Sequence, residues 1–305
     1  MKNILVIGGT YFTGRVFAMV AHGMGNKLTF INRGTFSMSH MEGIKEYKCD
    51  RHDIEGLKSL PYGEFDAVVD FCAYEPGDCR NLLENLNIKT GKYILLSTAD
   101  VYNREIRAPK DESTALQSSM GFCAAADYMW KKRNLETEAR KICGEKGIKL
   151  ILIRPAFIYG PYNYAPRESF YVQNICQHNV IPVPTDSTSK WNFVYVKDVA
   201  AALCSCIEKD FPSGEAFNLS NDEETITYDV FMQTLREVSD IPFETVPVTV
   251  NQVFEQNIPL PFPLTEEESE LYIAKKSKEL LGIEYTPLRI GLEKAYNAFK
   301  NVYSK

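Results

Sequence analysis

The strongest constraint on the fold is a short apolar run that ends in a cluster of glycines near the N-terminus. Ile4-Leu5-Val6-Ile7 has the composition of a buried strand, and Gly8-Gly9-Thr10-Tyr11-Phe12-Thr13-Gly14 follows it and opens a helical pattern. Glycines are required where a turn needs a positive φ and where a pyrophosphate approaches the amides of a helix N-terminus. The stretch therefore predicts a dinucleotide-binding strand, turn and helix, although an ordinary tight turn can have the same composition.

The first two thirds of the chain alternate β-rich runs with amphipathic helical stretches, the pattern of a parallel sheet with helices on both faces. The predicted strands cover residues 3–7, 27–31, 45–48, 66–71, 92–96 and 149–154. The apolar face expected of the first helix consists of Phe12, Val16, Met19 and Val20, and a long helix is expected from about residue 123 to 146. We therefore predict an α/β protein with a doubly wound, Rossmann-type parallel sheet.

The pattern becomes irregular after residue 160, where prolines are frequent. Further elements are expected as strands at 191–196 and 216–219 and as helices at 197–208, 227–239 and 288–301, with the Pro-rich stretch 258–263 as a surface loop. Residues 1–160, with 191–225 returning to them, are expected to form an NAD(P)-binding domain. Residues 161–190 and 226–305 would form a smaller C-terminal lobe that binds the substrate.

Composition and charge exclude several classes of protein. The net charge is -6 over 305 residues and the basic residues form no block, so nucleic acid is not expected as the main partner. No apolar stretch approaches the roughly 18 residues of a membrane helix, which predicts a soluble, cytoplasmic protein with no membrane contact.

The cysteines and histidines give no metal-binding pattern. The eight cysteines, at 49, 72, 79, 123, 143, 176, 204 and 206, contain no C-x-x-C pair, and the four histidines are dispersed. We expect reduced thiols and no metal site.

The end of the second predicted strand bears on the choice of dinucleotide. In Rossmann folds a residue at this tip contacts the 2' position of the adenosine ribose, and an acid there favours the free hydroxyl of NAD. Neutral Asn32 and cationic Arg33 take this place here. Because a cation attracts a 2'-phosphate, charge alone favours NADP over NAD, unless Arg33 is only a solvated turn residue.

A tyrosine and a lysine one helical turn apart are the candidates for proton transfer. Tyr128 and Lys132 project from the same face of the long predicted helix. We expect the ammonium to lower the pKa of the phenol from about 10, which suits an acid or base near neutral pH. Two other pairs have this spacing, Tyr272 with Lys276 and Tyr296 with Lys300. Only Tyr128 lies between the fifth and sixth predicted strands, at the sheet edge where such folds bind ligands.

The fifth predicted strand ends in hydroxyl side chains at the same edge of the sheet. Ser97 and Thr98 follow its last apolar residue. The Thr98 hydroxyl could hydrogen-bond the substrate oxygen that Tyr128 protonates or deprotonates, or it could simply cap the strand end.

Five ordered motifs, with the glycine turn and the Tyr128/Lys132 pair, resemble the NAD-dependent epimerase/dehydratase family of the extended short-chain dehydrogenase/reductases. The motifs are S-T-A-D-V-Y at 97–102, R-P-A-F-I-Y-G-P at 154–161, N-F-V-Y-V-K-D-V-A at 192–200, F-N-L-S at 217–220 and K-K-S-K-E-L-L-G-I at 275–283. The resemblance covers nearly the whole chain. It implies an NAD or NADP cofactor, an epimerase or reductase acting on a sugar or nucleotide-sugar hydroxyl, and a homodimer formed through the long helices.

The resemblance also implies roles for single residues. Thr98, Tyr128 and Lys132 match the catalytic triad, and Lys132 would also hold the nicotinamide ribose. The residues expected around the cofactor are Gly8, Thr10, Tyr11, Phe12, Thr13, Gly14, Asn32, Arg33, Asp50, Arg51, Phe71, Cys72, Ala73, Tyr128, Lys132 and Pro155. Those expected on the substrate side are Asp100, Tyr162, Asn163 and Arg167.

The sequence departs from the family pattern in three places, and the first of them leaves an alternative open. Tyr11 replaces the usual middle glycine of the turn and must point away from the pyrophosphate or lie across it. This turn, followed by N-R-G, is similar to a branch that includes chloroplast stem-loop RNA-binding proteins, so the alternative is a catalytically diverged protein that binds RNA or senses a dinucleotide. Ala99 and Asp100 replace the acid and base of the 4,6-dehydratases, which argues against dehydration, and the asparagine that some 4-epimerases have near Phe157 is missing.

Overall fold

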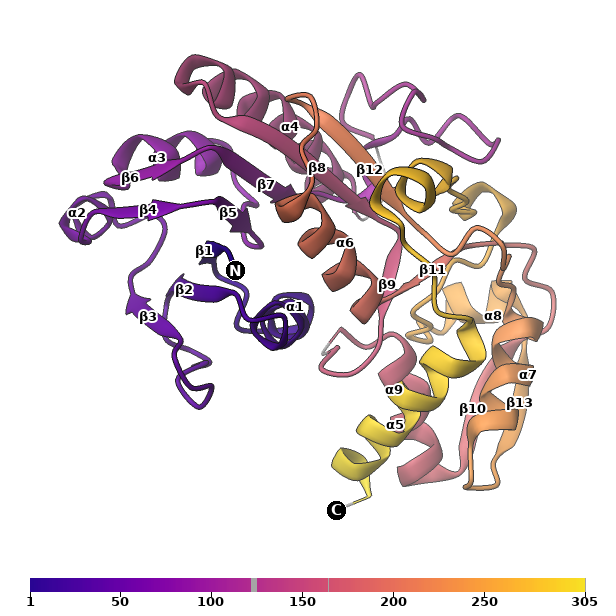
Figure 1. Cartoon of the computed structure of the whole chain (residues 1–305). Coiled ribbons are helices and arrows are strands. Elements are labelled where there is room, and N and C mark those ends of the chain that lie inside the picture. Colours follow the sequence, from indigo (N-terminus) through magenta and orange to yellow (C-terminus); the bar gives the residue numbers. More distant parts are fainter. Residues whose placement is uncertain (122–124, 164, 305) are drawn as a thin grey trace.

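A seven-stranded parallel sheet forms the centre of the computed structural model, which describes residues 1–121, 125–163 and 165–304 (Figure 1). In order of pairing, the strands are β12 (Glu215–Leu219), β8 (Lys149–Pro155), β7 (Lys92–Leu96), β5 (Ala67–Asp70), β1 (Asn3–Ile7), β2 (Lys27–Asn32) and β3 (Lys45–Lys48). All neighbouring pairs are parallel. The predicted α/β, Rossmann-type sheet is confirmed.

The order of strands reverses next to β1. The chain adds β2 and β3 on one side of β1 and then returns to its other side with β5, β7, β8 and β12. In such doubly wound sheets the carboxyl ends of the strands on either side of the reversal leave a crevice for a ligand. The fold therefore places the turn after β1 at this crevice.

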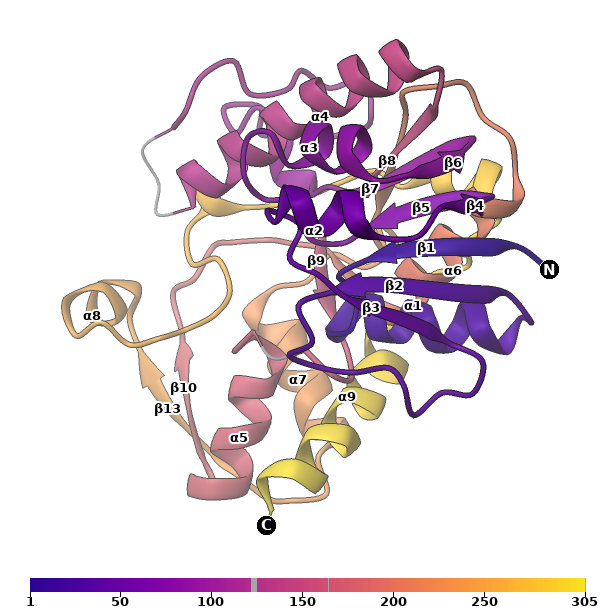
Figure 2. The same ribbon diagram turned by 90° about the vertical axis from the view of Figure 1, so that its left-hand side faces the viewer.

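Helices cover both faces of the sheet. Figure 2 shows α2 (Ile54–Ser59), α3 (Asp78–Asn85) and α4 (Ala126–Lys146) above it, while α1 (Phe12–Gly23) and α6 (Val196–Glu208) pack together on the opposite face. Alternate residues of β1 serve the two layers, Leu5 and Ile7 toward α2–α4 and Ile4 and Val6 toward α1 and α6. This alternation explains why the strand is apolar throughout.

A second group of elements lies beyond the carboxyl edge of the sheet. It comprises α5 (Glu168–His178), α7 (Tyr228–Val238), α8 (Val250–Glu255), α9 (Leu288–Tyr303) and the parallel pair β10 (Val180–Pro184) and β13 (Glu244–Val248). Trp191 and Phe262 stack in its core with ring centroids 5.2 Å apart. The division into a cofactor domain and a substrate lobe at the expected boundaries stays a prediction.

Shorter elements complete the chain. They are the parallel pairs β4 (Gly63–Phe65) with β6 (Ile88–Thr90) and β9 (Phe157–Tyr159) with β11 (Phe193–Tyr195), the 3-10 turns Ala99–Val101 and Glu266–Glu268, and a π-helical turn at Ser277–Leu281. The described part of α4 begins at Ala126, and Cys123 and the expected helix start near residue 123 lie outside the described residues.

Two local expectations were wrong. Of the predicted apolar face of α1, Phe12, Val16 and Val20 pack against the core but Met19 is 48% exposed, and the buried residues are Thr13, Gly14, Phe17, Ala18 and Ala21. Small residues face inward because α1 packs against α6 as well as the sheet. The Pro-rich stretch is irregular, as predicted, but it is not only a surface loop, because Phe262 is buried in the aromatic core.

Candidate active site

Two neighbouring cavities lie along the carboxyl edge of the sheet. The larger, of about 750 Å³, lies against the ends of β1, β2 and β5, and the smaller, of about 270 Å³, against the ends of β7 and β8. Phe12, Thr13, Phe71, Tyr74 and Leu96 line both. Of the residues expected around the cofactor, the larger cavity is lined by Gly8, Thr10, Tyr11, Phe12, Thr13, Gly14, Asn32, Arg33, Asp50, Arg51, Phe71 and Cys72.

The glycine turn has the geometry that its sequence predicts. Gly8 and Gly9 adopt φ values of 69° and 66°, which L side chains rarely adopt. A Cβ on Gly14 would lie 2.2 Å from the Cα of Gly9, so α1 can approach the turn this closely only with glycine there. The turn thus brings the first amides of α1, which have no partner within the helix, to the wall of the larger cavity.

The sequence left open whether Tyr11 points away from the cofactor crevice or lies across it. In the structure its ring lies at the wall of the crevice. Its ring packs against Phe36, with the centroids 5.3 Å apart, and keeps 41% of its surface exposed. Both rings line the larger cavity. The residue that replaces the usual glycine therefore extends the apolar wall on the β2 side of this cavity.

Two polar residues lie at the tip of β2. Asn32 is hydrogen-bonded within the protein, and Arg33 is exposed. Asn32 donates from Nδ2 to Glu46 at 2.6 Å, and its Oδ1 accepts a hydrogen bond from the Gly34 amide at 2.6 Å. Arg33 is exposed and lines the larger cavity. The Asn32 amide already has partners within the protein. Arg33 is therefore the residue at this tip that could contact a 2'-phosphate.

Arg51 lines the larger cavity but uses its charge within the protein. Its Nη1 and Nη2 lie 2.9 Å and 3.1 Å from the two carboxylate oxygens of Asp70, at the end of β5. Burial alone would raise the pKa of Asp70, yet Arg51 and the Tyr93 hydroxyl hold it below its ordinary value. The Arg51 side chain can therefore lie against a ligand in this cavity, while its guanidinium holds the loop after β3 to the end of β5.

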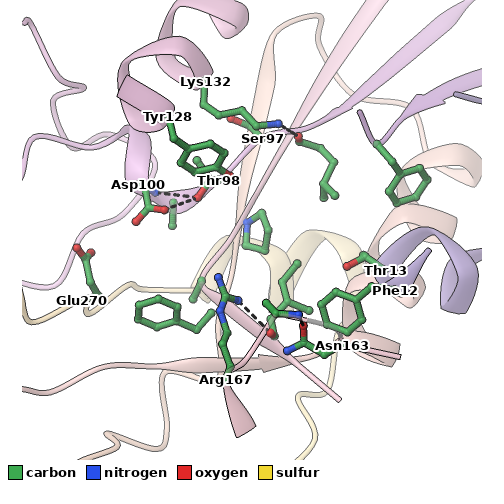
Figure 3. Close-up of a pocket in the computed structure, with 18 of the residues that line it drawn as sticks. Phe12, Thr13, Ser97, Thr98, Asp100, Tyr128, Lys132, Asn163, Arg167 and Glu270 are labelled. Carbon is green, nitrogen blue, oxygen red and sulfur yellow. Dashed lines mark hydrogen bonds between the residues drawn. The ribbon is translucent and has the colours of Figure 1, made fainter. Parts of the chain in front are cut away.

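The expected catalytic residues meet at the smaller cavity (Figure 3). Thr98 follows β7, and Tyr128 and Lys132 lie one turn apart on α4. Thr98 donates a hydrogen bond to Asp100 Oδ2 at 3.0 Å and accepts one from the Asp100 amide at 3.2 Å. Pro155, at the end of β8, closes the same cavity.

The expected effect of Lys132 on Tyr128 is contradicted. Burial and the carboxylate of Asp100 raise the pKa of Tyr128 above its ordinary value, and the hydrogen bond with Thr98 and the charge of Arg167 only partly oppose this. The Lys132 ammonium instead donates to the backbone carbonyls of Ala73 at 2.8 Å and Leu96 at 3.1 Å, and burial lowers its pKa to about 8. Its charge is directed at the carbonyls near the ends of β5 and β7, and the pKa of the Tyr128 phenol is raised, not lowered.

Three of the four residues expected on the substrate side line the smaller cavity, and Tyr162 does not. Asp100, Asn163 and Arg167 line the smaller cavity. Asn163 is buried and donates to Glu168, whereas Arg167 lies 5.2 Å from the Phe157 ring centroid. Tyr162 is not among the described residues that line either cavity; its ring lies 5.0 Å from the Arg15 guanidinium. A positive φ of 68° turns this part of the chain, which spacing alone could not reveal.

Sequence reasoning missed three side chains in these walls. Tyr74 follows the expected Phe71-Cys72-Ala73 segment, and its ring centroid lies 4.4 Å from the Lys132 ammonium. Glu270 and Tyr272 reach the smaller cavity from a segment far along the chain. The position of Tyr74 just after the expected segment was a usable signal; Tyr272 was noted only for its spacing from Lys276, and no local pattern marks Glu270.

The strand order, the glycine turn and the paired cavities together define a Rossmann-type α/β protein. The model of the NAD dependent epimerase/dehydratase family matches residues 4–220, and the chain belongs to this family. Among curated proteins it is similar to the chloroplast stem-loop binding protein of 41 kDa b of Arabidopsis thaliana, with 28% identity over 295 residues, 92% of this chain and 74% of that protein.

Solved structures show the same fold. The UDP-glucose 4-epimerase of Thermotoga maritima, determined with UDP-glucose, has a TM-score of 0.75 at 19% identity and covers 98% of this chain and 99% of its own. The UDP-glucuronic acid 4-epimerase of Bacillus cereus, determined with NAD, has a TM-score of 0.77 at 18% identity, with coverages of 99% and 97%. At such identities the likeness supports the fold alone.

Two general features complete the description. Within the described residues, no helix is both long and apolar enough to span a bilayer. Cys49, Cys72, Cys79, Cys143, Cys176, Cys204 and Cys206 are free thiols. Acids, histidines and cysteines form no cluster able to hold a metal ion in the part of the chain that the structure describes.

Proposed function

We propose that this protein is an NAD(P)-dependent epimerase or reductase that moves a hydride at a sugar or nucleotide-sugar hydroxyl. The observation that carries the proposal is the convergence of Thr98, Tyr128 and Lys132 on a cavity that shares five lining residues with the one at the glycine turn. Membership of the family supports it independently. The larger cavity would hold the dinucleotide and the smaller one the reacting part of the substrate.

The residues of the larger cavity fit a dinucleotide. The close approach of Gly14 to Gly9 leaves the amides of the first turn of α1 facing an opening of about 750 Å³. An anionic pyrophosphate is stabilised at such a helix N-terminus. The apolar surfaces of Tyr11 and Phe36 would face the adenosine half.

Tyr128 is assigned the proton transfer. Its raised pKa keeps the phenol protonated, which suits a donor to the substrate oxygen when a carbonyl is reduced. Thr98 would hydrogen-bond the same oxygen. Lys132, fixed by two carbonyl oxygens, would bind the ribose hydroxyls and keep positive charge near the cavity. When bound, an oxidised nicotinamide supplies the hydride acceptor and a second positive charge, which would favour the phenolate needed in the oxidative direction.

Identification of the ligand released on denaturation is the first test. Mass spectrometry of the purified protein should detect NAD, NADP or their reduced forms, and tight retention would favour an epimerase, which must return the hydride, over a reductase, which exchanges its cofactor. Tyr128→Phe should abolish turnover while dinucleotide affinity stays within about twofold, since the phenol acts on the substrate oxygen. Tyr62→Phe, on an exposed tyrosine outside both cavities, is the matched control. Retained turnover in Tyr128→Phe would contradict the assignment.

A second candidate is a binding protein that retains RNA, which is favoured by the similarity to a stem-loop binding protein. The net charge of -6 weighs against it. RNA-binding assays at several salt concentrations discriminate the two: tight binding that falls steeply with salt supports this candidate, and weak binding that salt does not change removes it.

A further inference from the structure

Glu270 is a fixed carboxylate in the wall of the smaller cavity. It is 4% exposed and comes from the segment between the two short turns at Glu266–Glu268 and Ser277–Leu281. Arg104 Nη2 lies 2.7 Å from its Oε1, and the Tyr272 hydroxyl donates a hydrogen bond to its Oε2. Two partners within the protein thus set the orientation of this acid at the edge of the cavity.

Asp100 brings a second carboxylate to the same region. Figure 3 shows Asp100 and Glu270 on the same side of the cavity, with Tyr128 next to Asp100. Burial raises the pKa of Glu270, and the negative charge of Asp100 raises it further. Asp100 acts on Tyr128 in the same direction. The two carboxylates are therefore close enough to influence each other and the group that contacts the reacting oxygen.

The cationic groups of this cavity lie elsewhere. Lys132 and Arg167 are the lysine and the arginine among its described lining residues. The Lys132 ammonium is directed at two backbone carbonyls. Arg167 Nη1 donates to the Ile158 carbonyl at 3.2 Å, on the wall formed by the segment after β8, apart from Asp100 and Glu270 in Figure 3. Among the described lining residues, negative and positive charge thus occupy different walls, while Arg104, which does not line the cavity, pairs with Glu270.

We propose, resting on the function proposed above, that Glu270 and Asp100 select substrates whose sugar ring is neutral around the reacting carbon and exclude rings that carry a carboxylate there. Ionised carboxylates accept hydrogen bonds from hydroxyl groups, which such a ring supplies. A third carboxylate beside Tyr128 would meet the like charge of Asp100, a repulsive element that gives specificity.

UDP-glucose and UDP-glucuronic acid are a matched pair of probes, because they differ only in the carboxylate at C6. Isothermal titration of each into the protein with NAD added should show UDP-glucose binding at least about tenfold more tightly, equivalent to about 1.4 kcal/mol. Glu270→Gln preserves shape and removes the charge, so the ratio should fall toward one, mainly through a gain in affinity for UDP-glucuronic acid.

Two further variants separate charge from structure. Glu266→Gln makes the same change at an exposed site in the same segment and should leave the ratio unchanged. Tyr272→Phe removes the hydrogen bond to Glu270 but not its charge, so the preference for UDP-glucose should persist. NADH binding, followed by fluorescence, reports on the proposed function separately, since its loss would count against the dinucleotide site and not against the sugar preference. Equal affinity for the two probes, preference for UDP-glucuronic acid, or no binding of either by the wild-type protein would overturn the inference.

Discussion

Glu136 and Arg154 form a buried, two-point ion pair beneath the smaller cavity. Arg154 Nε lies 2.9 Å from Glu136 Oε1, and Arg154 Nη2 lies 2.6 Å from Oε2. Glu136 is one turn beyond Lys132 on α4, and it also accepts a hydrogen bond from the Ser97 hydroxyl at 2.7 Å. The pair therefore ties α4 to the ends of β7 and β8, and so fixes Lys132 relative to Thr98.

Glu136→Gln should strongly destabilise the protein. The change leaves the Arg154 guanidinium buried without its counter-charge, and breaking a buried pair in this way costs about 3 to 5 kcal/mol. Urea denaturation measures the loss. Glu84→Gln, which removes one partner of the exposed Arg80, should shift the midpoint little. A small effect of Glu136→Gln would show that the pair does not hold α4 in place.

Gly14→Ala should abolish dinucleotide binding and destabilise the fold. The added Cβ would lie 2.2 Å from the Gly9 Cα, so either the turn or α1 must move. Gly144→Ala is the control, because a Cβ there meets no atom within 4 Å and should stabilise α4 by about 0.5 to 1 kcal/mol. Thermal denaturation and NADH fluorescence measure both effects. Normal NADH affinity in Gly14→Ala would contradict the proposed cofactor cavity.

The stability of the protein should rise with pH through the titration range of Lys132. Burial lowers the pKa of Lys132 from 10.5 to about 8 in the folded protein. Between these two values the unfolded chain binds a proton that the folded protein does not, so raising the pH favours folding by up to roughly 3 kcal/mol; below about pH 8 this residue contributes no pH dependence.

Lys132→Met tests this linkage, because methionine cannot titrate. Urea denaturation at about pH 7.5 and about pH 10 should give a change in unfolding free energy that is more positive for the wild-type protein than for the variant. Parallel pH dependence in the two proteins would rule out a lowered pKa of Lys132.

Arg33→Ser should shift the cofactor preference toward NAD. Arg33 is exposed at the tip of β2 and lines the larger cavity, where it would contact a 2'-phosphate. Its loss should weaken NADPH binding by about fivefold or more and leave NADH binding nearly unchanged, with the difference decreasing at high salt. Fluorescence titration of both dinucleotides gives the ratio. Equal losses for both would mean that Arg33 does not read the 2' position.

Local sequence patterns predicted the elements whose determinants are close together in the chain. The main strands, the glycine turn and the α/β class follow from apolar runs and from glycines that short-range sterics require. The same reasoning failed where a second contact decided the outcome. Met19 fits the apolar face of an isolated helix but is exposed, because other residues of α1 pack against the sheet and α6, and Phe262 lies in a Pro-rich stretch yet is buried against Trp191.

For the candidate site too, the sequence indicated the residues, whereas contacts with other segments determined their properties. Tyr128 and Lys132 could be selected from spacing and position, but the direction of the Lys132 ammonium and the raised pKa of Tyr128 depend on Ala73, Leu96 and Asp100, which come from other segments. Tyr162 was expected on the substrate side from the resemblance, and its ring lies 5.0 Å from the Arg15 guanidinium, so its part in substrate binding stays a prediction.

The sequence by itself determined the parallel sheet, the glycine turn after the first strand and the identity of the residues at the strand ends, because each depends on steric or apolar preferences within one segment. Only the tertiary structure decided which charges share a cavity, since Asp100 and Glu270 are far apart in the chain and meet only after folding. Electrostatic interactions act through space, so the properties of the site follow from distances that no single segment contains.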